Sequence, residues 1–207
     1  MADIDVLVAR ARRYLPSVPD ITIDTTAVEI YRRFCRESEV WRVPLDSVTM
    51  RSGTRYFDAS LLMPRHAMLY KILWMSVDNE PLEQMPSREI MLRDIASRGR
   101  PSAFVMYPGA DLQIYPQPEK DVVITGAAVL QPKASASVIE DFIADDHLMT
   151  LVNGIVAAIL AMPQRGWYDP RSAGMYEQLF REGTEEARRH ANAEDVPREY
   201  TMTYGGI

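Results

Sequence analysis

Apolar residues recur at helical spacing in the first forty positions of the chain. A short amphipathic helix is predicted over residues 2–14 and ends before Pro16. A second helix is predicted to begin at Asp24 or Thr25, whose side chains can cap free amides, and to fade near Glu39. The apolar positions that define the first helix are Ile4, Leu7, Val8 and Ala11.

From Trp41 onward the apolar period shortens to two, which is typical of strands with one buried face. Proline and glycine separate the alternating runs, as expected for turns. Strands are predicted over 41–46, 56–58, 67–77, 104–107, 112–115 and 122–130. Only Ser87–Arg98 interrupts them with helical spacing. The middle of the chain is therefore predicted to be a β-rich insert, a small sandwich whose strand aromatics are mostly core.

Helical spacing returns after Pro132 and predicts two longer helices. The first, capped by Asp145, is strongly apolar and stops at Met162-Pro163, while the second has Asp169 as its cap and Pro170 in its first turn. Glycine lowers the stability of a helix, so Gly183 inside that last helix predicts that another backbone passes close by.

This order predicts an α+β fold in which helices from both ends of the chain form one bundle around an inserted β-rich domain. The predicted parts are the first half of the bundle (1–40), the insert (41–132), the second half of the bundle (133–194) and an extended C-terminal tail (195–207). The tail contains Pro197 and two terminal glycines, and it has no helical period.

Charge and cysteine content narrow the functional classes. The 29 acidic residues outnumber 23 basic ones and give a formal net charge of -6, which argues against tight binding to nucleic acid. The same acidity suits a channel wall past which DNA slides. The single cysteine, Cys35, excludes an internal disulfide and is predicted to be buried, so we expect a protein made in a cytoplasm.

Candidate chemistry is sparse. The best metal candidate is the run Asp145-Asp146-His147 with Glu140 and Asp141, but acidic residues at the start of a helix stabilise its free amides without any metal. We interpret the run as a helix start. The chain has no glycine-rich phosphate loop, nucleophile elbow or His-Glu-x-x-His helix, so we expect no catalytic residues, no metal and no cofactor.

Two aromatic features suggest contacts with partners. Trp167 and Tyr168 lie in the loop between the last two helices, where they either anchor a partner or pack on the end of the bundle. In the tail, Tyr200, Met202 and Tyr204 fall on one side of an extended strand. This alternation favours docking on another protein, although folding back onto the chain's own bundle remains the alternative.

One stretch carries a more specific pattern. Residues 145–189 combine an acidic segment, an apolar helix, Trp167-Tyr168-Asp169-Pro170 and a final helix ending in Glu186-Ala187-Arg188-Arg189. Together with the segments 100–109 and 112–116, the pattern resembles head-to-tail connector, or adaptor, subunits of tailed bacteriophages. The ending Tyr200-x-Met202-x-Tyr204-Gly205-Gly206 is similar to the C-terminus of the tail-tubular connector of short-tailed phages.

The resemblance implies a structural virion protein and not an enzyme. It implies a homo-oligomeric ring of about twelve copies at the head-tail junction that docks beneath the portal protein, offers the tail tube or nozzle an attachment surface, and lets packaged DNA pass without sequence-specific binding. The alternatives are a module that binds a ligand or host-surface group through an exposed aromatic shelf on the insert, and a small metal enzyme using the acidic run.

Overall fold

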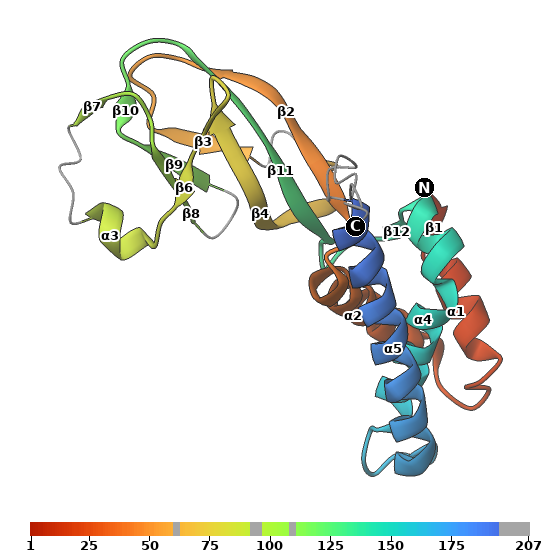
Figure 1. Cartoon of the computed structure of the whole chain (residues 1–207). Coiled ribbons are helices and arrows are strands. Elements are labelled where there is room, and N and C mark those ends of the chain that lie inside the picture. The colour runs from red at the N-terminus through yellow and green to blue at the C-terminus, as the bar shows by residue number, and fades with distance from the viewer. Residues whose placement is uncertain (60–62, 92–96, 108–110, 195–207) are drawn as a thin grey trace, which may run out of the picture. The chain divides into compact units, whose positions relative to one another are not determined.

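The chain divides into a helical unit and a β unit (Figure 1). The computed structural model describes residues 1–59, 63–91, 97–107 and 111–194. The β unit is Trp41–Val138, and the helical unit combines Met1–Val40 with the described residues that follow Val138. Short strands β1 (Ala2–Asp3) and β12 (Val138–Ile139) lie near the beginning of the chain and at the return from the β unit.

The first two helices are α1 (Asp5–Arg12) and α2 (Asp20–Ser38). Helix α2 begins earlier than the predicted start at Asp24 or Thr25, so that prediction is wrong. Pro19 occupies its N-cap position with extended backbone. The Thr25 hydroxyl donates to the Ile21 carbonyl oxygen at 2.8 Å, one turn back inside the helix, and caps nothing.

The two long helices are α4 (Asp141–Leu160) and α5 (Pro170–Glu194). The predicted cap of α5 is confirmed, because Asp169 Oδ1 accepts hydrogen bonds from the backbone N–H groups of Arg171 (3.2 Å) and Ser172 (3.1 Å). The predicted cap of α4 is wrong. Helix α4 begins at Asp141, with Glu140 at the N-cap position, so Asp145 lies inside the helix.

Helix α4 is the central helix of the unit and contacts α1, α2 and α5. Among the described helices it is the one long and apolar enough to cross a membrane, and half of that apolar segment is buried within the chain. Gly154 lies where α4 meets α2 and α5: a Cβ there would come within 2.7 Å of Ile30 and 2.6 Å of Phe180. A close neighbour was also predicted at Gly183, and the structure supplies the Thr150 side chain instead of a backbone.

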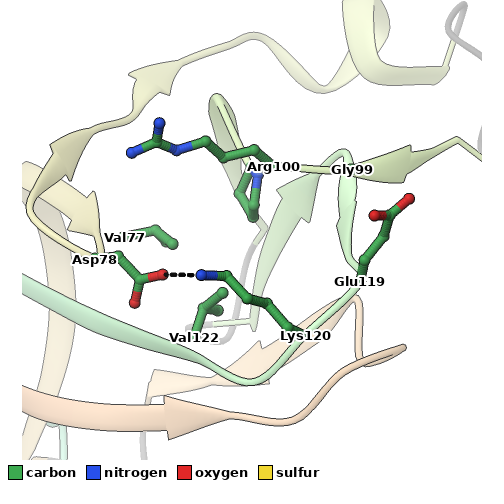
Figure 2. A pocket seen from close by; sticks show the side chains of 8 residues that line it. Val77, Asp78, Gly99, Arg100, Glu119, Lys120 and Val122 are labelled. Atoms are coloured by element: carbon green, nitrogen blue, oxygen red, sulfur yellow. Dashed lines mark ion pairs between the residues drawn. The ribbon is translucent and has the colours of Figure 1, made fainter.

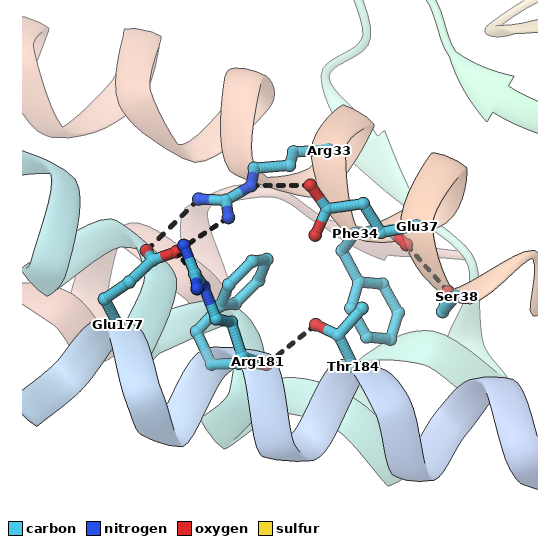
Figure 3. Close-up of polar contacts among 8 residues, drawn as sticks. Arg33, Phe34, Glu37, Ser38, Glu177, Arg181 and Thr184 are labelled. Atoms are coloured by element: carbon cyan, nitrogen blue, oxygen red, sulfur yellow. Dashed lines mark hydrogen bonds and ion pairs between the residues drawn. The ribbon is translucent and has the colours of Figure 1, made fainter.

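A polar network joins α2 to α5 along one edge of this core (Figure 3). The Arg33 guanidinium donates to both carboxylate oxygens of Glu177, at 2.7 and 3.1 Å, and its Nε donates to Glu37 at 2.9 Å. The same guanidinium lies 4.8 Å from the ring centroid of Phe180, which is fully buried. Bidentate pairing of this kind fixes orientation as well as adding attraction. Hydrogen bonds from Arg33 lower the pKa of Glu177.

The first sheet of the β unit contains the three longest strands. Its order is β2-β11-β4-β5, and every neighbouring pair is antiparallel. The bounds are β2 (Arg42–Met50), β4 (Ala67–Val77), β5 (Glu80–Pro81) and β11 (Val122–Pro132). Strand β4 matches its predicted range, whereas β2 and β11 run beyond theirs. Asp78 and Asn79 both have positive φ, as a tight turn between β4 and β5 requires.

The second sheet has the order β3-β9-β8-β6. Its strands are β3 (Tyr56–Asp58), β6 (Glu83–Gln84), β8 (Ala103–Met106) and β9 (Asp111–Tyr115), and a separate parallel pair joins β7 (Arg98–Gly99) to β10 (Gln117–Pro118). Ala103 and Val105 pack with Met85 on one face of the second sheet, against Tyr107 and Tyr115.

The helix predicted over Ser87–Arg98 is only partly confirmed. Helix α3 covers Ser87–Met91, residues 92–96 lie outside the described part, and Arg98 belongs to a strand. The mixture of helices and sheets confirms the predicted α+β class. The bundle arrangement, the sandwich and the extended tail stay predictions.

Two glycine substitutions test the role of close helix packing. Gly154→Ala should lower the free energy of unfolding by about 1–3 kcal/mol, because the added methyl group has no space between Ile30 and Phe180. Gly174→Ala on α5 is the matched control, since a Cβ there meets nothing within 4 Å. Gly174→Ala should raise the free energy of unfolding by about 0.5–1 kcal/mol, because alanine has a higher helix propensity than glycine. Urea denaturation measures both, and equal effects would contradict the packing argument.

Candidate partner-binding surfaces

The turn between α4 and α5 presents one aromatic side chain to solvent and half-buries the other. Tyr168 is 48% exposed, whereas Trp167 is half-buried with the Arg165 guanidinium 5.9 Å from its ring centroid. The Trp167 indole N–H is buried and has no hydrogen-bond partner within the described chain. Trp167 is thus partly covered and Tyr168 is exposed, and the anchoring of a partner by either residue stays a prediction.

Tyr168 borders an open groove of about 530 Å³ at this end of α4 and α5. Small residues, among them Ala157, Ala161 and Gly174, form its lining, while Glu177 and Arg181 contribute charge. The turn itself is well held: the Asp169 N–H donates to the Leu160 carbonyl oxygen at 3.0 Å, and hydrogen bonds from Ser172 lower the pKa of the Asp169 carboxyl. Tyr168 is thus an exposed side chain on a defined turn.

The three other predicted partner-binding residues are Tyr200, Met202 and Tyr204. They lie outside the described residues, so their docking stays a prediction.

A charged cavity of about 410 Å³ lies at one end of the β unit (Figure 2). Its lining comes from the end of β4, the segment after β7 and the approach to β11. Lys120 Nζ lies 3.6 Å from Asp78 Oδ2, and Arg100 donates to Glu80 at 2.9 Å. These two ion pairs neutralise four charges in and beside the cavity, and Glu119 adds a further carboxylate to its lining.

The strand aromatics are not uniformly buried. Trp41 and Phe104 are core residues, with 3% and 2% exposure. Tyr56 on β3 is 59% exposed and Trp74 on β4 is 54% exposed, so the prediction that strand aromatics are core is wrong for these two. Alternation alone could not identify them, since both faces of a strand repeat with the same period.

A second cavity of about 410 Å³ opens between α4 and α5, and two of the five metal candidates, Asp146 and His147, line it. Asp146, His147 and Thr150 line it from α4, and Glu186 and His190 line it from α5. Asp145, Asp146 and His147 lie inside α4, not at its start, so the predicted helix start is wrong. Sequence reasoning also missed Glu186 and His190, although their i,i+4 spacing places them on one face of α5.

The cavity between α4 and α5 does not assemble a metal site. Within the described ranges, no group of three His, Cys, Asp or Glu side chains is arranged to hold a metal ion. His147 packs on Phe34, with ring centroids 5.1 Å apart. Burial lowers the pKa of His147 below its ordinary value of 6.5, opposed by the nearby carboxylates of Asp146 and Glu186. The imidazole is therefore neutral at pH 7.

The lowered pKa of His147 predicts a loss of stability in acid. The unfolded chain binds a proton at His147 more readily than the folded chain does. The contribution of neutral His147 to the free energy of unfolding is therefore complete above pH 6.5, and it declines as pH falls from 6.5 through the lower pKa of the folded state. The thermal midpoint should fall more between pH 7.5 and pH 5.5 in the wild type than in His147→Gln. Parallel pH dependence of the two proteins by circular dichroism would contradict this assignment.

The sequence matches the model of a known protein family. No curated protein matches the chain. The model of one family, described as SU10 adaptor protein, matches residues 2–202, which is nearly the whole sequence. This match confirms the resemblance to phage head-to-tail adaptors, and the chain belongs to the SU10 adaptor protein family.

Proposed function

We propose that the chain is a structural subunit of a homo-oligomeric ring at the junction of head and tail, where it docks beneath the portal and extends the DNA channel. The single observation that carries this proposal is the family match over residues 2–202. In the proposal the terminal helices form the bundle of each subunit, and the subunit provides an attachment surface for the tail tube or nozzle.

The physical character of the chain supports a structural role. Its formal net charge of -6 disfavours adhesion to DNA phosphates, which a passage for packaged DNA requires. In the described part of the chain, exposed apolar side chains such as Tyr168, Met175 and Leu179 lie on rigid helices or a fixed turn. Rigid apolar surfaces lose little conformational entropy on binding and suit permanent assembly.

The location of the protein in virions tests the proposal directly. Cryo-electron microscopy of tailed particles should show a ring of this chain between the portal and the tail, because both neighbours require a matched docking surface. Heads made without the chain should retain the portal and lack tails. A position only at the tips of tail fibres would contradict the proposal and favour a module that binds a host-surface ligand.

The C-terminal residues 195–207 supply the proposed contact with the portal. A chain lacking them should keep a thermal midpoint near that of the wild type and fail to bind portal-containing heads in co-sedimentation, since Tyr200, Met202 and Tyr204 would no longer be buried by the portal.

Alternating substitutions refine this deletion. Replacing Tyr200, Met202 and Tyr204 with Ala should reproduce the loss of binding, whereas replacing the intervening Thr201 and Thr203 with Ala should not. An unfolded truncated chain would instead show that the segment covers its own helices, and normal docking would show that the portal contact lies elsewhere.

A further inference from the structure

The cavity between α4 and α5 is negatively charged and has no cation of its own. Asp146 has no Lys or Arg partner in the described ranges, and the nearest cationic group to Glu186 is His190, whose Nε2 lies 4.0 Å from Glu186 Oε1 and is charged only when protonated. With His147 neutral, both carboxylates face the same partly enclosed volume. Asp146 is exposed and the Glu186 side chain is 66% exposed, so the two carboxylates form an open negative patch that attracts a cation.

Apolar residues in and around the cavity favour a cation that is carried on an apolar side-chain stem. Phe142 forms part of its lining and is 40% exposed. Helical spacing places Met149 on the face of α4 that carries Phe142 and Asp146, and Leu179 on the face of α5 that carries Gly183 and Glu186; they are 44% and 42% exposed. A volume of about 410 Å³ admits a long side chain. Arginine combines a stem that packs on apolar surface with a guanidinium that binds carboxylates in two directions, so it fits this cavity better than a small hydrated ion.

The outer face of α2 carries arginines of the required kind. Ile21 is 69% exposed there, and Arg36 is exposed four residues beyond the half-exposed Arg32. Neither arginine has an ion-pair partner in the described chain, in contrast to Arg33 on the same helix, which is held by Glu177 and Glu37. The spacing of Ile21, Arg32 and Arg36 places an apolar and a basic group along one stripe of α2.

On α2, Phe34 contacts His147 beside the cavity, and Arg36 falls on the opposite face of that helix by its spacing from Phe34. Helix α5 meets Arg33 of α2 through Glu177, whereas Gly183, Glu186 and His190 lie on its other edge, beside the cavity. One molecule therefore presents the α2 stripe and the acidic cavity as two different patches. Two different complementary patches on each subunit are what a closed heterologous ring requires.

We propose that the cavity formed by Phe142, Asp146, His147, Glu186 and His190 receives Arg36 from α2 of a second copy of this chain. The α2 stripe and the α4–α5 cavity are then the two halves of the repeated subunit interface. This inference rests on the proposed ring function and identifies the surfaces that form it. Charge and apolar character match on the two halves, whereas either half paired with itself would bring like charges together.

Charge reversal with mixing tests the interface. Asp146→Arg and Arg36→Glu should each reduce the number of copies bound per portal-containing head by at least about tenfold, because each variant places like charges at every interface of its own ring. An equal mixture of the two should restore assembly, since both kinds of interface in an alternating ring are again complementary. Arg65→Glu and Asp111→Arg, both exposed on the β unit, are the matched controls and should assemble normally.

The outcomes separate this inference from the proposed function. Far-ultraviolet circular dichroism establishes that both variants fold, and the mixture provides a readout that misfolding could not produce. Normal assembly of either single variant overturns the interface while leaving the ring intact. If mixing does not restore binding to heads, the cavity has another occupant, such as residues 195–207 or the portal, and the proposed interface is overturned as well. If the wild-type chain forms no ring on portal-containing heads, both proposals fail together.

Discussion

The close approach of α5 to α4 is the constraint on which the helical unit depends. At Gly154 the absent side chain leaves room for Ile30 of α2 and Phe180 of α5 to meet on the central helix. Phe180 is fully buried, and burial of a phenylalanine side chain is worth about 1.5–3 kcal/mol. Since α2 precedes the β unit and α4 follows it, this contact joins distant parts of the chain and offsets the entropy of closing a long loop.

Around that contact, neighbouring residues of α2 differ in their surroundings: some are buried in the helical unit and others face outward. Phe34 and Cys35 are fully buried, and burial raises the pKa of the Cys35 thiol well above its ordinary value, which keeps the sulfur protonated and unreactive. Arg33 turns toward Glu177 and fixes the edge between α2 and α5. Arg36, one helical turn away, has no such partner in the described chain and remains available to another molecule.

Two cavities on the described part of the chain differ in their charge. The chain belongs to the SU10 adaptor family, and among the described residues no group of His, Cys, Asp or Glu side chains is arranged to hold a metal ion. The cavity on the β unit has two ion pairs in and beside its lining, in addition to Glu119, whereas Asp146 and Glu186 in the cavity between α4 and α5 have no Lys or Arg partner in the described residues. That difference is electrostatic, and it makes the second cavity the better candidate for a partner's side chain.

Periodicity by itself determined the α+β class, the exact span of strand β4 and the cap at Asp169, because each depends on nearby residues. It misplaced the starts of α2 and α4. Acidic and hydroxyl side chains such as Asp145 and Thr25 favour a cap in isolation, yet both lie inside helices that begin earlier. Only the tertiary structure decided that Gly154 is a contact point, that Trp74 faces solvent and that Glu186 lies across a cavity from Asp146. These facts depend on which helix or strand packs beside each residue, and local spacing does not encode that choice.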